Sequence, residues 1–176
     1  MSTESLMWLL PILWMLHNIE ELLLFKRWLL KNREMIAGRF PRTGRLILPV
    51  LDAVTTPILM VAVAEEFVLL SLITLITVEA GWYAVFAGFI VGHTLHVGVH
   101  IALGLKLKQY VPAVVTAALT LPYSVVVLYT LATRGLIDLG GVIFWSVWAS
   151  IFLVGNVILS HFLARKFDRW LRRVYA

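Results

Sequence analysis

Long apolar stretches, each sufficient to cross a lipid bilayer, are the feature that most restricts the fold of this chain. Residues 57–78 and 82–104 each form such a stretch, and a transmembrane helix needs about 20 mostly apolar residues. The 176-residue sequence is 61% hydrophobic and only 14% charged, a composition that excludes an ordinary soluble domain. The chain is therefore expected to form one all-α domain, a polytopic bundle of membrane helices.

Five spans account for the apolar stretches, with no second domain. They are predicted at about residues 5–25, 57–78, 82–104, 111–132 and 142–164. Thr55 shortly before Pro57 is a typical helix start, which favours a second span from Pro57 over one that covers residues 46–64. Residues 46–54 are then expected to enter the membrane at its interface. This choice puts Glu65 and Glu66 near the middle of the membrane.

Basic residues are distributed very unequally between the two ends of such a bundle. One end receives the segments 26–45, 106–108 and 165–173, which hold fourteen of the fifteen Lys and Arg residues. Only Arg134 lies at the other end. Because cytoplasmic loops are enriched in Lys and Arg, we expect the basic end and the C-terminus in the cytoplasm and the N-terminus outside. The net charge of +5 then needs no nucleic-acid partner, and the expected surroundings are lipids.

Ionisable side chains lie inside the predicted spans, where each is costly unless it is paired or functional. All five histidines of the chain are among them, together with two pairs of adjacent glutamates. These residues are His17, Glu20, Glu21, Glu65, Glu66, His93, His96, His100 and His161. With a rise of about 1.5 Å per residue, His17, Glu65 and His96 come to nearly the same depth. Polar groups of four helices are therefore expected to meet in one band of the membrane, nearer its cytoplasmic side.

The spacing of these residues in the sequence places two groups of them each on one face of a helix. His17, Glu20 and Glu21 share one face, and the three histidines between residues 93 and 100 share another. Imidazoles and carboxylates are ligands of transition metals, and the absence of cysteine excludes thiolate sites. The predicted metal ligands are His17, Glu20, Glu21, Glu65, His93, His96, His100 and His161.

The element His17-x-x-Glu20-Glu21 resembles the motif that names the HXXEE family of small bacterial membrane proteins. That family is also described by a further histidine and a Tyr-x-Pro-Gly motif. Tyr110-Val111-Pro112 matches this motif, with Ala113 in the place of the glycine. The resemblance extends over most of the chain and implies a multi-pass protein of the bacterial inner membrane. It implies no reaction, because the family is uncharacterised.

The donor set favours iron, with zinc or manganese as alternatives, and is large enough for two ions. The first hypothesis is a dinuclear iron oxidoreductase that acts with dioxygen on a hydrophobic small-molecule substrate and receives electrons from a cytoplasmic donor. Glu21 and Glu66 would be its catalytic proton-transfer groups. A zinc-dependent intramembrane hydrolase and a non-enzymatic metal or proton carrier are the alternatives.

Overall fold

The computed structural model describes residues 1–175 and contains only helices as regular secondary structure within that range. The helices are α1 (Thr3–Met7), α2 (Leu9–Arg39), α3 (Pro41–Asp52), α4 (Thr56–Glu79), α5 (Tyr83–Leu107), α6 (Val114–Thr133) and α7 (Leu139–Val174). Only Trp8 separates α1 from α2, so the two form one continuous span, Thr3–Arg39. Together with α4, α5, α6 and α7 this makes five helices long and apolar enough to cross a membrane. The all-α fold with five helices that could span a membrane is thus confirmed.

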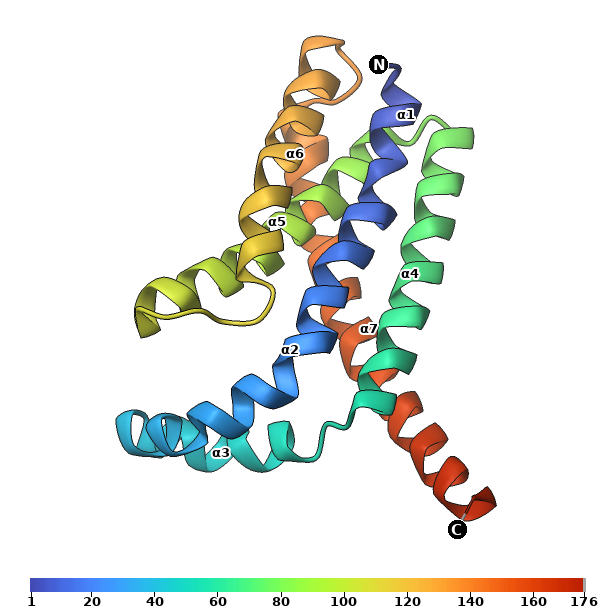
Figure 1. Ribbon diagram of the computed structural model, residues 1–176. Coiled ribbons are helices and arrows are strands. Elements are labelled where there is room, and N and C mark those ends of the chain that lie inside the picture. Colours follow the sequence, from blue (N-terminus) through green and yellow to red (C-terminus); the bar gives the residue numbers. More distant parts are fainter. Residues whose placement is uncertain (176) are drawn as a thin grey trace.

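The spans form an upright bundle with two distinct ends (Figure 1). The N-terminus, the α4–α5 turn and the α6–α7 loop lie at one end, which is the top in Figure 1. The α2–α3 hairpin, the α5–α6 loop and the C-terminus lie at the other. Fourteen of the fifteen Lys and Arg residues therefore gather at this second end, as the sequence predicts. The side of the membrane that this end faces stays a prediction.

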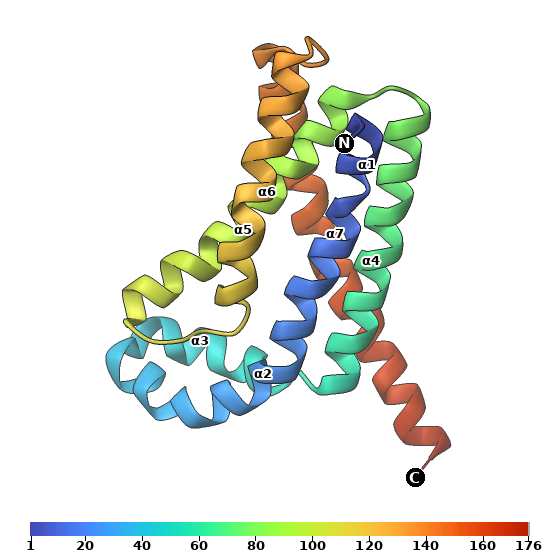
Figure 2. The same cartoon turned by 45° about the horizontal axis from the view of Figure 1, so that its top comes forward.

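The α2 helix extends well beyond the first predicted span. It turns away from the upright bundle before it meets α3, and the α5–α6 loop lies over this hairpin (Figure 2). The Trp28 indole N–H donates to the Tyr110 carbonyl at 2.7 Å, and the Gln109 amide donates to Asn32 Oδ1 at 2.9 Å. These contacts fix the loop that leads into α6. The next membrane helix, α4, begins where the sequence predicts, with Thr55 as its N-cap.

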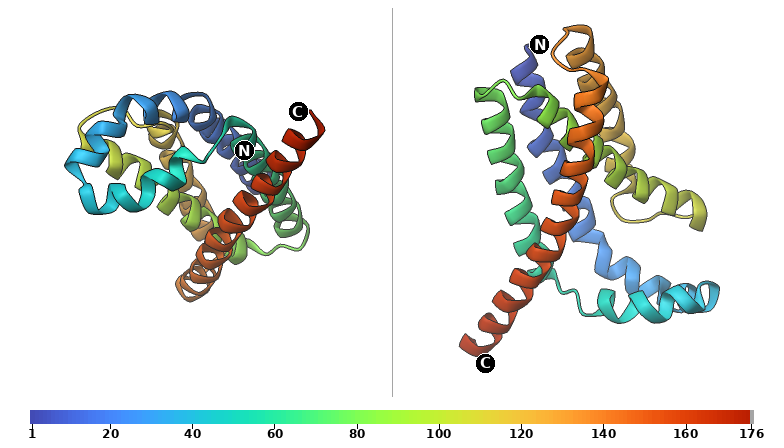
Figure 3. Two further views of the ribbon diagram at one scale, coloured as in Figure 1. Left: turned by 90° about the horizontal axis from the view of Figure 1, so that it is seen from below. Right: turned by 180° about the vertical axis from the view of Figure 1, so that it is seen from behind.

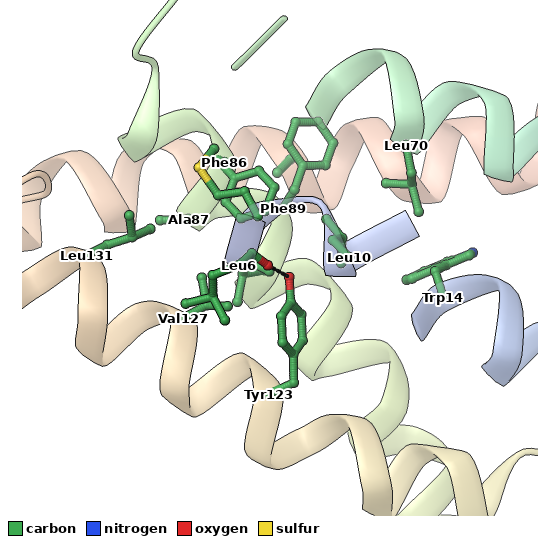
Figure 4. Close-up of a cluster of buried hydrophobic side chains, with 13 residues drawn as sticks. Leu6, Leu10, Trp14, Leu70, Phe86, Ala87, Phe89, Tyr123, Val127 and Leu131 are labelled. Carbon is green, nitrogen blue, oxygen red and sulfur yellow. Dashed lines mark hydrogen bonds between the residues drawn. The ribbon is translucent and has the colours of Figure 1, made fainter. Parts of the chain in front are cut away.

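The half of the bundle nearest the N-terminus has an apolar core (Figure 4). Leu10 of α2, Phe86 of α5 and Val127 of α6 are fully buried in it. The Tyr123 hydroxyl, which lies in the same core, donates to the Leu6 carbonyl at 3.1 Å. This packing holds α1, α2, α5 and α6 together above the polar groups described below.

Close contact between α5 and α7 depends on two glycines. A Cβ atom on Gly88 would come within 2.6 Å of the backbone of Trp145, and one on Gly92 within 2.7 Å of Leu153 Cδ1. Seen from behind, α7 crosses the bundle and packs against α4 and α5 (Figure 3). Small residues thus allow α5 and α7 to approach closely, and this contact fixes the orientation of α5, the helix that carries three of the histidines.

Candidate metal centre

Three histidines from two helices meet inside the bundle. His17 of α2 and His96 and His100 of α5 each offer one ring nitrogen to a group whose nitrogens all lie within 4.8 Å of one another. The Nε2 atoms of His17 and His96 are 3.2 Å apart. His17 is fully buried, whereas the other two are partly exposed. We call this group the histidine triad; in residues 1–175 no other set of His, Asp or Glu side chains has this geometry.

A chain of hydrogen bonds orients the His17 ring. Its Nδ1 lies 3.2 Å from the Thr116 hydroxyl, which lies 2.6 Å from Glu20 Oε2. A carboxylate only accepts, so the hydroxyl proton is donated to Glu20 and the hydroxyl accepts from His17 Nδ1–H. With its proton assigned to Nδ1 by this network, the His17 ring keeps the lone pair of Nε2 for the triad.

Glu20 is bound by the beginning of α6 and is not part of the triad. Its Oε2 accepts the Thr116 N–H at 2.8 Å, and its Oε1 accepts the Tyr110 hydroxyl at 2.5 Å and the Val115 N–H at 3.4 Å. The first N–H groups of a helix lack intrahelical acceptors, and the helix dipole favours a negative charge there. The Glu20 carboxylate therefore fastens α6 to α2 and, through Thr116, orients His17.

Tyr110 keeps the proton that it donates to Glu20. Partial burial of the phenol raises the pKa of Tyr110, and the hydrogen bond to the Glu20 carboxylate raises it further. The phenol is therefore neutral across the physiological range and acts as a permanent donor to this carboxylate.

The short segment before α6 makes the capture of Glu20 possible. Ala113 is fully buried and has a φ of +67°, in the left-handed region, which is unfavourable for a residue with a Cβ atom. The glycine of the Tyr-x-Pro-Gly motif would adopt this conformation without strain. In the same segment, the Pro112 carbonyl accepts His100 Nδ1–H at 3.0 Å. The two motifs singled out in the sequence thus form one structural unit around the triad.

A second carboxylate, Glu66 of α4, lies beside the triad. The Trp14 ring stacks on His96 with the ring centroids 5.1 Å apart, and its Nε1–H donates to Glu66 Oε2 at 3.1 Å. Asn18 Nδ2 lies 3.4 Å from the same oxygen. Glu66 and His96 also line one cavity of about 390 Å³. Trp14 therefore joins the Glu66 carboxylate to the triad.

Two predicted ligands have hydrogen bonds elsewhere in the bundle. Glu65 Oε2 accepts the Asn156 amide at 3.1 Å and so joins α4 to α7. His161 Nδ1–H donates to the Val157 carbonyl of its own helix at 3.0 Å. Neither residue belongs to the triad, and their roles as metal ligands stay predictions.

His93 and Glu21 lie close to the triad but outside it. His93 is 1% exposed, and neither of its ring nitrogens has a hydrogen-bond partner; its ring lies 5.2 Å from that of Trp14. The Glu21 carboxyl, on the same helix as His17, interacts electrostatically with His100 and His161. Metal binding by His93 and Glu21, and catalysis by Glu21 and Glu66, stay predictions.

Sequence patterns could have indicated some of the residues that were not predicted. Trp14 lies three residues before His17 on α2, and Asn18 lies four residues after Trp14, so helical spacing places Trp14 beside both of them. Thr116 had no such signal, because its role follows from the docking of α6 against α2. The roles of the backbone groups of residues 112–116 could not be predicted either, because every residue type carries a backbone N–H or carbonyl group.

Comparison with known proteins identifies one family. The model of the family described as "Protein of unknown function with HXXEE motif" matches residues 8–127, which include both motifs and the whole triad. No significant match was found among curated proteins or among solved structures.

Proposed function

We propose that this chain, which belongs to the HXXEE family of proteins of unknown function, binds a transition-metal ion within the membrane through His17, His96 and His100. The observation that carries the proposal is the convergence of three ring nitrogens within 4.8 Å. Burying three imidazoles side by side in a membrane protein is costly. Coordination of one ion would offset that cost, because it uses all three lone pairs.

The distance between His17 and His96 fits shared coordination of one ion. Two nitrogens bound to one tetrahedral zinc ion at about 2.0–2.1 Å are roughly 3.3 Å apart, and the Nε2 atoms of His17 and His96 are 3.2 Å apart. Metal-binding histidines usually donate their second ring N–H to an oxygen. His17 and His100 do so, to Thr116 and to the Pro112 carbonyl.

The donor set supports one ion more directly than two. The oxygens of Glu20 are already hydrogen-bonded to α6 and to Tyr110, so Glu20 is proposed to orient His17 and not to bind the ion. A second ion would need other ligands. Of the remaining predicted ligands, Glu21 and His93 lie nearest in sequence to residues of the triad. The pair of ions expected from the sequence therefore stays a prediction.

Three imidazoles leave at least one coordination position open for water or substrate, so we propose a catalytic role. Bound iron would supply redox chemistry with dioxygen, and bound zinc would supply an activated water for hydrolysis. Iron remains our first proposal and zinc the second. Glu66, fixed by Trp14 and Asn18, would move protons in either reaction. A carrier of metal or protons has less support, because an apolar core fills the half of the bundle above the triad.

We propose that the basic end of the bundle faces the cytoplasm of a bacterial cell, as the distribution of Lys and Arg favours. The triad would then be reached by electrons from a cytoplasmic donor, and the substrate would come from the membrane.

Metal analysis of the purified protein by mass spectrometry tests the proposal. Chelator-washed wild-type protein is expected to hold about one ion per chain, the number that one triad can bind. His17→Ala and His96→Ala should reduce this to background. His161→Ala separates the triad from the larger ligand set predicted from the sequence. It should keep the metal if the triad alone binds it, because His161 is a histidine of a span that lies outside the triad. Folded wild-type protein without metal, or triad variants that keep it, would contradict the proposal. The metal found then separates the iron reaction from the zinc reaction.

A further inference from the structure

The cavity beside the triad is open toward the surrounding lipid. It lies between α2, α4, α5 and α7, and its volume of about 390 Å³ falls in the range of small-molecule pockets, roughly 300–1,000 Å³. Among its lining residues, Leu95 of α5 and Val154 of α7 are 60% and 63% exposed on the outside of the bundle. In a bilayer this surface faces hydrocarbon. A molecule dissolved in the membrane can therefore enter sideways past Leu95 and Val154, beyond the close contact of α5 with α7 at Gly88 and Gly92.

The inner wall of the cavity carries the polar groups. His96 and Glu66 line it together with Asn156. The Asn156 amide N–H is donated to Glu65, which leaves its carbonyl oxygen able to accept a hydrogen bond. Trp14 and Asn18 both donate hydrogen bonds to Glu66, so the Glu66 carboxyl group acts as an acceptor. No Lys or Arg lines the cavity within the described residues. The wall therefore suits a ligand that donates hydrogen bonds.

Depth in the membrane selects against charged ligands as well. Glu66 lies near the middle of the 24-residue helix α4, so the polar wall lies far from both membrane surfaces. An anionic head group would lose its hydration on the way and would meet the Glu66 carboxylate on a wall that has no Lys or Arg. A hydroxyl or amide loses much less and recovers a hydrogen bond at the wall.

We propose that this cavity binds a long hydrocarbon chain with a neutral, hydrogen-bond-donating head group such as a hydroxyl, with the chain between α5 and α7 and the head against Glu66 and Asn156. This deepens the proposed function and rests on it for the chemistry, because the head then lies beside His96 of the triad. Binding itself does not depend on the metal.

Photo-crosslinking in nanodiscs of zwitterionic lipid tests this inference. The probes are a long-chain alcohol that carries a diazirine in mid-chain and the carboxylic acid of the same length. The alcohol is expected to label residues at the mouth of the cavity, and the acid should label them roughly tenfold less. Val154→Trp fills the mouth and should abolish this labelling. Leu119→Trp is the matched control, because Leu119 is an exposed apolar residue of α6 that does not line the cavity.

Glu66→Gln separates recognition of the head from binding of the chain. If the new amide oxygen accepts from Trp14 and Asn18 as Glu66 Oε2 does, its NH₂ group faces the cavity and can donate to a carboxylate. Labelling by the alcohol should fall and labelling by the acid should rise. Equal labelling by both probes in the wild type, or labelling that Val154→Trp leaves unchanged, would overturn the proposal.

Metal content, measured on the same samples, keeps the two proposals apart. Val154→Trp should keep its metal while it loses alcohol labelling, and His17→Ala should lose its metal while it keeps the labelling. Failure of the metal proposal would therefore leave the lipid site standing, and failure of the lipid site would leave the metal proposal standing.

Discussion

In the half of the bundle nearest the N-terminus, the helices contact one another through apolar side chains such as Leu10, Phe86 and Val127. In the half that holds the triad, α2 meets α5 and α6 through hydrogen bonds, among them those of His17 and Glu20. Apolar packing depends on volume and shape and tolerates compensating changes, whereas a buried polar network needs each specific partner. The first half therefore stabilises the bundle, and the second fixes the positions of the side chains that could do chemistry.

The largest effect on stability is expected from Phe86→Ala in the apolar half. Phe86 is fully buried, so its removal leaves a cavity and should cost about 3–5 kcal/mol of unfolding free energy. The metal content of the molecules that remain folded should not change. Unfolding in detergent micelles, followed by metal analysis of the folded fraction, measures both quantities. Phe144→Ala, at an exposed position of α7, is the control. A folded Phe86→Ala protein without metal would show that the two halves are not independent.

Glu20→Gln tests the polar half with almost no change of volume. The amide keeps one acceptor but places an NH₂ group against the donors of α6, so the folded state should lose about 1–3 kcal/mol. Because the chain from Glu20 through Thr116 orients His17, metal affinity should fall roughly tenfold to a hundredfold. Competition with a chelator of known affinity measures this. Glu34→Gln, on the exposed surface of α2, should change neither quantity. Unchanged metal affinity in Glu20→Gln would refute the orienting role.

Much of the bundle could be predicted because the membrane permits so few structures. Apolar length and turn residues were sufficient for the spans, and a fixed rise per residue brought His17 and His96 to one depth. These are properties of single helices, and each can be calculated without knowledge of the neighbouring helices.

The partners of individual side chains could not be predicted in the same way. His93 and His96 share a helix face in the sequence, yet only His96 joins the triad. The way α5 packs against its neighbours decides which of its turns lies nearest to His17, and the sequence pattern does not specify this packing. Glu20 has the spacing of a metal ligand but binds the beginning of α6. That outcome depends on the backbone conformation of residues 112–116, for which the pattern of side chains contains no direct signal.

Tyr110→Phe should have a smaller effect than Glu20→Gln, because it removes only one of the donors to Glu20. The loss of the hydroxyl should cost about 0.5–1.5 kcal/mol, and metal affinity should decrease by less than in Glu20→Gln. The same unfolding and chelator measurements apply, with Tyr129→Phe at an exposed position of α6 as the control. An effect as large as that of Glu20→Gln would mean that Tyr110, and not the helix N-terminus, holds the carboxylate.

The smallest effect, and the only gain, is expected from Ala113→Gly. Ala113 has a φ of +67°, which costs a residue with a Cβ atom about 1–2 kcal/mol, and part of this is offset by the greater flexibility of glycine in the unfolded chain. A net stabilisation of roughly 0.5–1 kcal/mol should follow.

Ala117→Gly is the matched control for this gain, because Ala117 is also fully buried but lies inside α6. Glycine there should destabilise the helix by about 0.5–1 kcal/mol, so the two substitutions should act with opposite signs in the same unfolding assay. If Ala113→Gly also strengthens metal binding, the strain at this residue opposes the geometry of the triad. If Ala113→Gly changes stability but not metal binding, the segment before α6 contributes to stability as the apolar half does. The division between a stabilising half and a half that positions side chains then does not hold for this segment.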